Sequence, residues 1–285
     1  MKNKSKRGKA AFILLLVLAV FTAWTVRGNV TFEITHTETV SEKIPPQFSG
    51  FKIAHVSDLH NARFGKDNRR LIEALRREKP DIIAITGDLV DSQSTDIDGS
   101  VAFVRSAVKI APCYYVTGNH DRWLKDEYFI LEEKLLSLGV TVLHGESITL
   151  DRNGEQITLL GVDDPLFSQI NAPRRESDDA VLAEISESSK FQILLAHRPE
   201  RFEIYKKHGI DLALCGHTHG GQLRLPFIGG IIAPDQGFFP KYDAGIYKDG
   251  GTEMIISRGL GNSGVPLRVN DRPEIVIITL ASHAS

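Results

Sequence analysis

The sequence predicts an α/β domain that follows one N-terminal apolar helix. Two observations lead to this prediction: a charge-free run over residues 10–26, and short β-branched runs that alternate with amphipathic segments from residue 51 onward. Alternating strands and helices imply a largely parallel sheet with helices outside it. The hydrophobic content of 42% is ordinary for a globular protein, so residues 51–285 are expected to form one domain with its own core.

The N-terminus has the composition of a membrane anchor. Residues 1–9 contain five basic residues and no acid, and the apolar run that follows is near the lower limit for crossing a hydrocarbon core of about 30 Å. This run is longer than the apolar stretch of a cleaved signal peptide, and Phe21-Thr22-Ala23 offers no small-residue cleavage site. We therefore predict a transmembrane or signal-anchor helix over residues 10–27, with Trp24 at the interface.

The basic flank at residues 1–9 should stay in the cytoplasm, which makes the chain a single-pass cell-membrane protein with an extracytoplasmic domain. Secretion after signal cleavage is the alternative. The net charge of −2 provides no global basic field, so nucleic acid is not an expected partner, and no obligate protein partner is evident. Cys113 and Cys215 lie in apolar runs without paired spacing and are expected to be buried thiols.

The elements expected after the anchor follow one another along the chain. Residues 28–50 form a connecting segment in which Val30, Phe32 and Ile34 alternate and could pair as an edge strand. The first half then predicts strands at 52–56, 82–86 and 114–117, with helices at 68–78, 101–110 and 127–138. The second half predicts strands at 140–143, 157–162, 192–196, 212–215, 254–257 and 275–280, with helices at 178–186 and 200–208.

Five polar motifs directly follow predicted strands. They are Asp58-Leu59-His60, Gly87-Asp88, Gly118-Asn119-His120-Asp121, Ala196-His197 and Gly216-His217-Thr218-His219. Open α/β sheets form their binding crevice at the carboxyl ends of the strands, so these side chains are expected to meet there. Imidazole, carboxylate and one amide oxygen suit Mn²⁺, Zn²⁺, Fe or Co better than Ca²⁺. The absence of cysteine from these motifs argues against a closed structural zinc site.

In this order the motifs resemble the pattern D-x-H, G-D, G-N-H-[DE], H and G-H-x-H of the calcineurin-like metallophosphoesterases, over roughly residues 51–280. The resemblance implies a four-layer αββα sandwich of two mixed sheets. It also implies two divalent metal ions as cofactors. It implies Asp58, His60 and His219 as ligands of the first metal, Asn119, His197 and His217 as ligands of the second, and Asp88 as the bridge.

The same resemblance implies that His120 is the histidine that does not bind metal and instead protonates the leaving group or stabilises phosphoryl charge. Asp121 would orient its ring. The implied reaction is direct in-line attack on phosphorus by metal-bound hydroxide, without a phosphoenzyme. Two divalent ions bring four positive charges and ionised Asp58 and Asp88 remove two. A bridging hydroxide removes one more, so that about one positive charge is left to attract an anionic ester. We therefore expect a phosphodiesterase.

Two alternatives stay open. A phosphomonoesterase would use the same ligands with an added cationic group near the phosphate, for which Arg122 is a candidate. A non-catalytic metal-binding scaffold is the alternative from another class, and such members of the fold typically lack His120 or several ligands.

The expected substrate is a phosphoester. An envelope lipid and a nucleotide-linked lipid are the two candidates. Gly220-Gly221-Gln222 and the tail over 259–274 resemble a membrane-linked bacterial subgroup that includes phosphodiesterases and enzymes similar to UDP-2,3-diacylglucosamine pyrophosphohydrolases. An outward-facing domain would not meet a cytoplasmic nucleotide-lipid. The apolar segment 223–232 with Phe238-Phe239 could form a lip at the rim of the site. Burial against the second sheet is the favoured interpretation.

The remaining histidines and one acidic pair are assigned structural roles. His55 lies inside a strand and matches no ligand position, and His144 and His208 are expected at the surface. The pair Asp163-Asp164 precedes a proline and is expected to form a turn.

Overall fold

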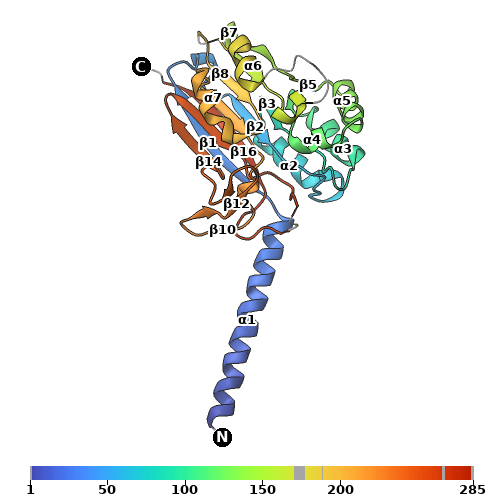
Figure 1. The fold of residues 1–285 in the computed structure, drawn as a ribbon, viewed down its shortest axis with the longest axis vertical. Helices are drawn as coiled ribbons and strands as arrows, with labels where there is room; N and C mark the ends of the chain where they lie inside the picture. The colour runs from blue at the N-terminus through green and yellow to red at the C-terminus, as the bar shows by residue number, and fades with distance from the viewer. Residues whose placement is uncertain (1, 170–176, 188, 265–266, 284–285) are drawn as a thin grey trace.

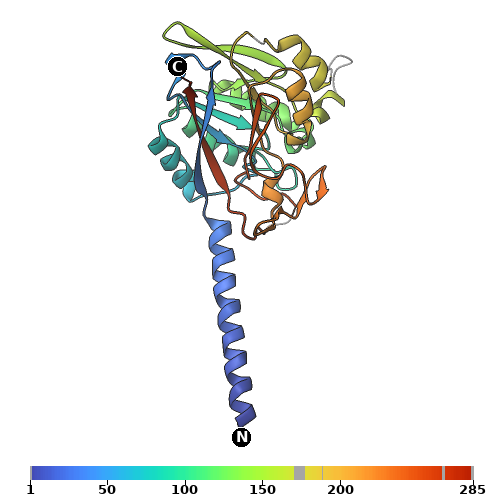
Figure 2. The same ribbon diagram turned by 90° about the vertical axis from the view of Figure 1, so that its left-hand side faces the viewer.

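The computed structural model describes residues 2–169, 177–187, 189–264 and 267–283, with residues 2–8 and 168–169 described by their backbone alone. Helix α1 (Lys2–Val30) projects from the rest of the chain as an isolated rod, as both views show (Figures 1 and 2). Within it, the 22 residues Lys9–Val30 are long and apolar enough to cross a membrane, and none of this stretch's apolar window is buried. The predicted helix over 10–27 lies inside α1.

The first sheet has six strands in the order β1 (Glu33–Ser41), β16 (Glu274–Ser282), β2 (Lys52–Val56), β3 (Ile82–Thr86), β4 (Cys113–Val116) and β5 (Thr141–Val142). Strands β2 to β5 are parallel, whereas β16 is antiparallel to β2 and parallel to β1. The connecting segment therefore does supply an edge strand. It begins at Glu33 instead of Val30 because α1 continues to Val30.

The second sheet also has six strands, in the order β14 (Gly245–Asp249), β15 (Thr252–Ile256), β9 (Leu212–Cys215), β8 (Gln192–Leu195), β7 (Glu155–Gly161) and β6 (Glu146–Arg152). The four central strands are parallel, and an antiparallel hairpin closes each edge. Both sheets are mixed, as expected. Strands β6 and β14 had no counterpart among the predicted elements.

Helices cover the outer face of each sheet. Helices α2 (Arg69–Glu78), α3 (Ile97–Ala107) and α5 (Glu127–Ser137) pack on the first sheet, and α6 (Asp178–Ile185) and α7 (Phe202–Lys207) pack on the second. Short 3₁₀ turns occupy Pro46–Phe48, Lys66–Asn68, Pro165–Gln169, Pro199–Arg201 and His219–Gly221. The one-and-a-half-turn helix α4 (Asn119–Trp123) begins at a predicted ligand.

Three separate apolar cores establish the layer order. One joins the first sheet to its helices through residues such as Ile85 and Leu131. A second lies between the sheets and contains Ile53 and Leu214, and a third joins the second sheet to residues such as Tyr205. Since three buried interfaces separate four layers, the expected αββα sandwich is confirmed.

Residues 223–239 form an apolar arm outside both large sheets. The arm consists of two small hairpins, β10 (Arg224–Leu225) with β11 (Gly229–Gly230), and β12 (Ile232–Ala233) with β13 (Gly237–Phe238). Phe227 is fully exposed, and Phe238 and Phe239 are 73% and 65% exposed. The favoured interpretation, burial against the second sheet, is therefore wrong. Both views place the arm on the side of the domain from which α1 leaves (Figures 1 and 2).

Candidate metal centre

The five polar motifs meet at the carboxyl ends of strands from both sheets. Asp58 and Asp88 follow β2 and β3, and Asn119 follows β4, all in the first sheet. His197 and His217 follow β8 and β9 of the second sheet. All seven predicted ligands are buried, with at most 6% of any residue exposed. The strand order thus brings together in space residues that lie up to 161 positions apart in the sequence.

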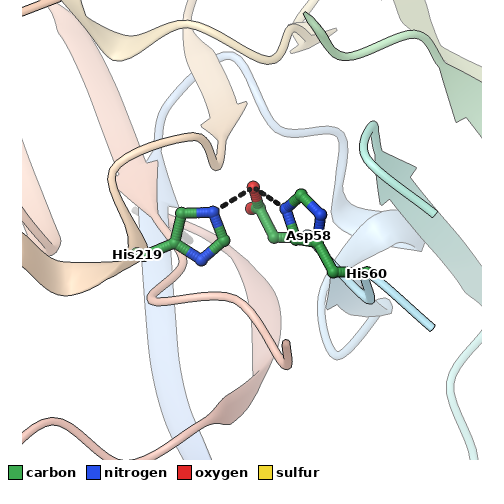
Figure 3. Close-up of side chains that lie close together, drawn as sticks. All are labelled: Asp58, His60 and His219. Carbon is green, nitrogen blue, oxygen red and sulfur yellow. Dashed lines mark ion pairs between the residues drawn. The ribbon is translucent and has the colours of Figure 1, made fainter. Parts of the chain in front are cut away.

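One group consists of Asp58, His60 and His219 (Figure 3). The Nε2 atoms of His219 and His60 lie 3.4 and 3.8 Å from Asp58 Oδ1, and Figure 3 shows both rings turned toward that oxygen. Neither ring nitrogen of His60 has a hydrogen-bond partner, although the side chain is fully buried. Buried polar atoms are normally satisfied, so this orphaned imidazole points to a missing ligand.

The second group surrounds Asp88. His197 Nε2 lies 3.3 Å from Asp88 Oδ2, 3.1 Å from Asn119 Oδ1 and 3.2 Å from His217 Nδ1. His60 Nε2 is 3.5 Å from the same Asp88 oxygen. Asp88 therefore lies between the two groups, which is the position that a bridging ligand needs.

Outer hydrogen bonds aim one nitrogen of each remaining ring at the centre. His197 Nδ1 is 2.8 Å from the Thr86 carbonyl and His219 Nδ1 is 3.3 Å from the Gly261 carbonyl. Since a carbonyl only accepts, His197 Nδ1 carries the proton and its Nε2 offers a lone pair. His219 Nδ1 also lies 3.3 Å from Nη2 of Arg268, and its Nε2 faces Asp58. His217 is reversed: its Nε2 lies 3.0 Å from Asp235 Oδ2, which leaves Nδ1 facing the centre. Such partners fix the tautomer of metal-binding histidines, so the residues fit divalent ions.

The motif glycines are required by close approach. A Cβ on Gly118 would lie 2.2 Å from Asp88 Oδ1, and one on Gly216 would lie 2.3 Å from Asp58 Oδ2. Five of the seven predicted ligands also adopt left-handed backbone angles, with φ between 43° and 71°: Asp58, His60, Asp88, His217 and His219. Left-handed non-glycine residues are strained and concentrate at functional sites, so the backbone supports the same assignment.

Charges within the centre are strongly coupled. Burial raises the pKa of Asp58, but His219 and His60 outweigh this effect and hold that pKa well below its usual range. Burial lowers the pKa of His197, but the Asp88 carboxylate outweighs it and raises the pKa to about 10. The two carboxylates thus attract positive charge, in the form of protons or of cations that displace them.

His120 lies beside the centre without joining it. Its ring centroid is 4.5 Å from that of His60. The backbone N–H and the hydroxyl of Ser92 lie 3.3 and 3.0 Å from its Nδ1, and its Nε2 lies 3.0 Å from Ser263 Oγ. A backbone N–H can only donate, so Nδ1 accepts and Nε2 carries the proton.

The expectation that Asp121 orients His120 is wrong. Asp121 Oδ2 instead accepts two backbone hydrogen bonds of 2.8 Å, from Asp88 and Gly118. Because α4 begins directly after Gly118, the Asp121 side chain turns back onto the helix start and cannot reach the ring. Ser92 takes over the orientation of His120.

A cavity of about 570 Å³ opens onto the second group. Its wall includes Asn119, His120, Trp123, His217 and Ser263, together with Arg198 and Asp235. The volume is within the range of small-molecule sites.

Arg198 links the cavity wall to His217. Its Nε donates a 2.6 Å hydrogen bond to the buried Asp164, and its Nη1 donates one of 2.5 Å to Asp235, which contacts the His217 ring. This network was not predicted. The adjacency of Arg198 to His197 was an available signal, whereas Asp235, 18 residues after His217, carried none.

The structure also tests the roles expected for three other histidines and for the Asp163-Asp164 pair. His55 is buried and its Nε2 lies 2.8 Å from Thr86 Oγ1, so it is structural as expected. His144 and His208 are not surface groups, since their side chains are only 18% and 11% exposed and both pair with carboxylates. Asp164 does form a turn, by accepting from the Leu166 backbone, but it also holds Arg198.

Comparisons with known proteins agree with this geometry. The sequence profile described as calcineurin-like phosphoesterase matches residues 51–221. A Bacillus subtilis protein named uncharacterized metallophosphoesterase YkuE is 33% identical over 257 residues, which cover 88% of this chain and 86% of that protein.

Two further relatives bear on activity and location. Phosphodiesterase YaeI of Escherichia coli is 33% identical over 235 residues, which cover 81% of this chain and 82% of that protein. A Danio rerio protein named transmembrane protein with metallophosphoesterase domain is 29% identical over 281 residues, which cover 95% of this chain and 62% of that protein.

Proposed function

The chain belongs to the calcineurin-like phosphoesterase family and is a phosphoric ester hydrolase, and from this premise we propose that it is a phosphodiesterase with two divalent metal ions. Asp58, His60 and His219 would hold one ion. Asn119, His197 and His217 would hold the other, with Asp88 between them. When bound, the ions would supply Lewis-acid activation of water and neutralise charge on the phosphoryl group.

His120 is suited to meet the substrate at the edge of the centre. Its Nδ1 accepts from Ser92, so its Nε2–H is directed toward the cavity that it lines. Burial is the largest influence on this ring and lowers its pKa. At neutral pH the ring is therefore uncharged and donates a hydrogen bond, either to a phosphoryl oxygen or to the departing oxygen.

The observation that carries the preference for diesters is the state of Arg198. Among the described residues that line the cavity it is the sole arginine or lysine, and Asp164, Asp235 and Glu200 engage its guanidinium. Among these described residues no cationic side chain is left to neutralise the second negative charge of a phosphomonoester. Arg122, the candidate for this role, is not part of the wall. The relative named phosphodiesterase is consistent with this preference.

The apolar arm supports a lipid-linked substrate. Pro234 and Asp235, between β12 and β13, belong to the cavity wall, while Phe227, Phe238 and Phe239 of the same arm are exposed. An arm that faces the side of α1 and borders the cavity could hold an acyl chain of an envelope phosphodiester. With the basic flank of α1 in the cytoplasm, this cavity would open on the outer side of the membrane.

Turnover of a small diester tests the reaction class. The full chain would be purified in detergent, stripped of metal and assayed with bis(nitrophenyl) phosphate and nitrophenyl phosphate, with and without Mn²⁺. We expect metal-dependent diester cleavage with the higher kcat/KM. The Asp88→Asn variant should lose at least about a thousandfold in kcat, because it removes the carboxylate between the two groups. Asp67→Asn, in an exposed turn, is the matched control.

Two results would contradict the proposal. Preferential cleavage of the monoester would reverse the substrate class but keep the metal centre. Stoichiometric metal binding without turnover of either ester would favour the scaffold alternative.

A further inference from the structure

A second cavity lies where α1 joins the domain. Its volume is about 470 Å³, and its lining residues are Trp24, Thr25, Arg27 and Gly28 of α1 with Glu33, Arg258, Arg268, Asn270, Asp271 and Arg272 of the domain. None of these residues is a predicted ligand of the metal centre. The cavity is therefore a separate site, shared by the anchor helix and the domain.

The position of this cavity along α1 matches the headgroup layer of a membrane. The apolar stretch Lys9–Val30 has 22 residues and would span about 33 Å as a helix, slightly more than a hydrocarbon core of about 30 Å. Trp24, Arg27 and Gly28 lie in its last two turns. Tryptophan and arginine are the residues that settle at the lipid–water interface. Lipid headgroups would therefore lie level with the mouth of the cavity.

The lining carries more positive than negative charge. Four arginines face two acids, Glu33 and Asp271, in the list of lining residues. Arg258 is paired with Glu33 and Glu274, and Arg268 with Asp271. Arg272 is also paired with Glu33, at 3.3 Å, so Arg27 is the lining arginine for which the described residues provide no ion-pair partner. The excess charge therefore comes from the α1 side of the cavity and favours an anion.

Three polar atoms in the wall are buried without a hydrogen-bond partner in the described part of the chain: Thr25 Oγ1, Arg272 Nε and Asp271 Oδ1. Asp271 is only 2% exposed. Two of these atoms can donate, and the third accepts. An anionic phosphate oxygen would satisfy the two donors. Asp271 Oδ1 faces the backbone of Gly220 instead.

From the cavity, its depth, its charge and these unpartnered atoms we infer that the junction binds the headgroup of an anionic phospholipid, whose phosphate contacts Arg27, Arg272 and Thr25. Free inorganic phosphate offers the same oxygens but is not held at the depth of the headgroup layer. The inference concerns binding and does not rest on the proposed phosphodiesterase activity.

The cavity wall also supports the metal centre. The Asn29 side chain holds the backbone of Arg268 by two hydrogen bonds of 2.8 Å. The Arg268 guanidinium donates to the Gly261 carbonyl, which also lies against His219 Nδ1. Lipid in the junction would thus order a wall that continues to a predicted ligand.

Lipid retention by the full chain tests the site. Native mass spectrometry from detergent would compare phosphatidylglycerol with phosphatidylcholine at equal mole fraction. We expect preferential retention of phosphatidylglycerol. Retention should fall about tenfold or more in the Arg27→Gln, Arg272→Gln double variant, as expected for lost charge-assisted hydrogen bonds. Arg63→Gln with Arg105→Gln removes the same charge outside the cavity and should leave retention unchanged.

A more conservative variant separates loss of the site from misfolding of the double variant. Thr25→Val keeps the shape of the side chain and removes one unpartnered hydroxyl, so it should also weaken retention. Equal retention of the two lipids, or a preference that survives both the double variant and Thr25→Val, would overturn the inference. Displacement of the lipid by millimolar inorganic phosphate would assign the site to a soluble anion and overturn the lipid assignment.

Discussion

Replacing Gly216 by alanine tests how tightly the backbone is packed against the metal centre. The added Cβ would lie 1.9 Å from Ser57 Oγ and 2.3 Å from Asp58 Oδ2. Contacts to a Cβ are essentially never shorter than 3.0 Å and are rarely shorter than 3.4 Å, so Asp58 Oδ2 must move by roughly 0.7–1.1 Å. Ligand distances in metal sites tolerate only about 0.2 Å. We therefore expect the affinity of the first site to fall at least about tenfold to a hundredfold, with about 1–3 kcal/mol of lost stability from overpacking.

Metal titration by calorimetry, together with thermal unfolding of the full chain, measures both effects. Gly154→Ala is the matched control: its φ is +87°, so alanine is strained there, but no atom lies within 4 Å of the added Cβ. This control should lose stability and keep both metals. If Gly216→Ala bound two equivalents as tightly as the unmodified protein, the role of this glycine in admitting Asp58 would be refuted.

Two further predictions concern the side chains of His144 and Asp235. Burial lowers the pKa of His144, but hydrogen bonds to Asp163 and Glu132 outweigh it and raise the pKa to about 9. The resulting stabilisation, at most about 3 kcal/mol, is complete below pH 6.5 and is lost as pH rises through 9. Urea unfolding should therefore separate His144→Gln from the unmodified chain at pH 6 but not at pH 10, and a gap that persists at pH 10 would count against the ion pairs. Asp235→Asn weakens the acceptor at His217 Nε2 and should reduce metal affinity about tenfold, with unchanged affinity on titration contradicting its supporting role.

The parts of the fold that the sequence predicted well are those whose pattern and burial agree. Strands β2, β3 and β9 have the predicted bounds because their residues are almost all buried and are flanked by polar ligand motifs. Strand β6 escaped prediction because it is an edge strand, exposed over most of its length, and its sequence Glu146–Arg152 carries charge at both ends. An exposed edge strand of this kind lacks the apolar pattern by which strands are predicted, so its sequence resembles that of a loop.

The metal centre also has residues that the sequence predicts well and residues that it does not predict. The motif residues converge because parallel strands deliver their carboxyl ends to one edge, which spacing alone can predict. The partners around them depend on loop geometry. Asp121 turned to the backbone of Asp88, and Arg198 found Asp164 and Asp235 through loops whose path no periodic pattern specifies.

The pairing of β1 with β16 bears on how the protein can fold after synthesis. Strand β1 directly follows α1, yet its parallel neighbour, which also separates it from β2, emerges about 240 residues later. At about 5–20 residues per second, β1 would wait roughly 10–50 s for this partner. During that interval the edge of the first sheet is open next to the membrane, with unpaired backbone groups that could join another chain. Completion of this sheet is therefore a late event in folding.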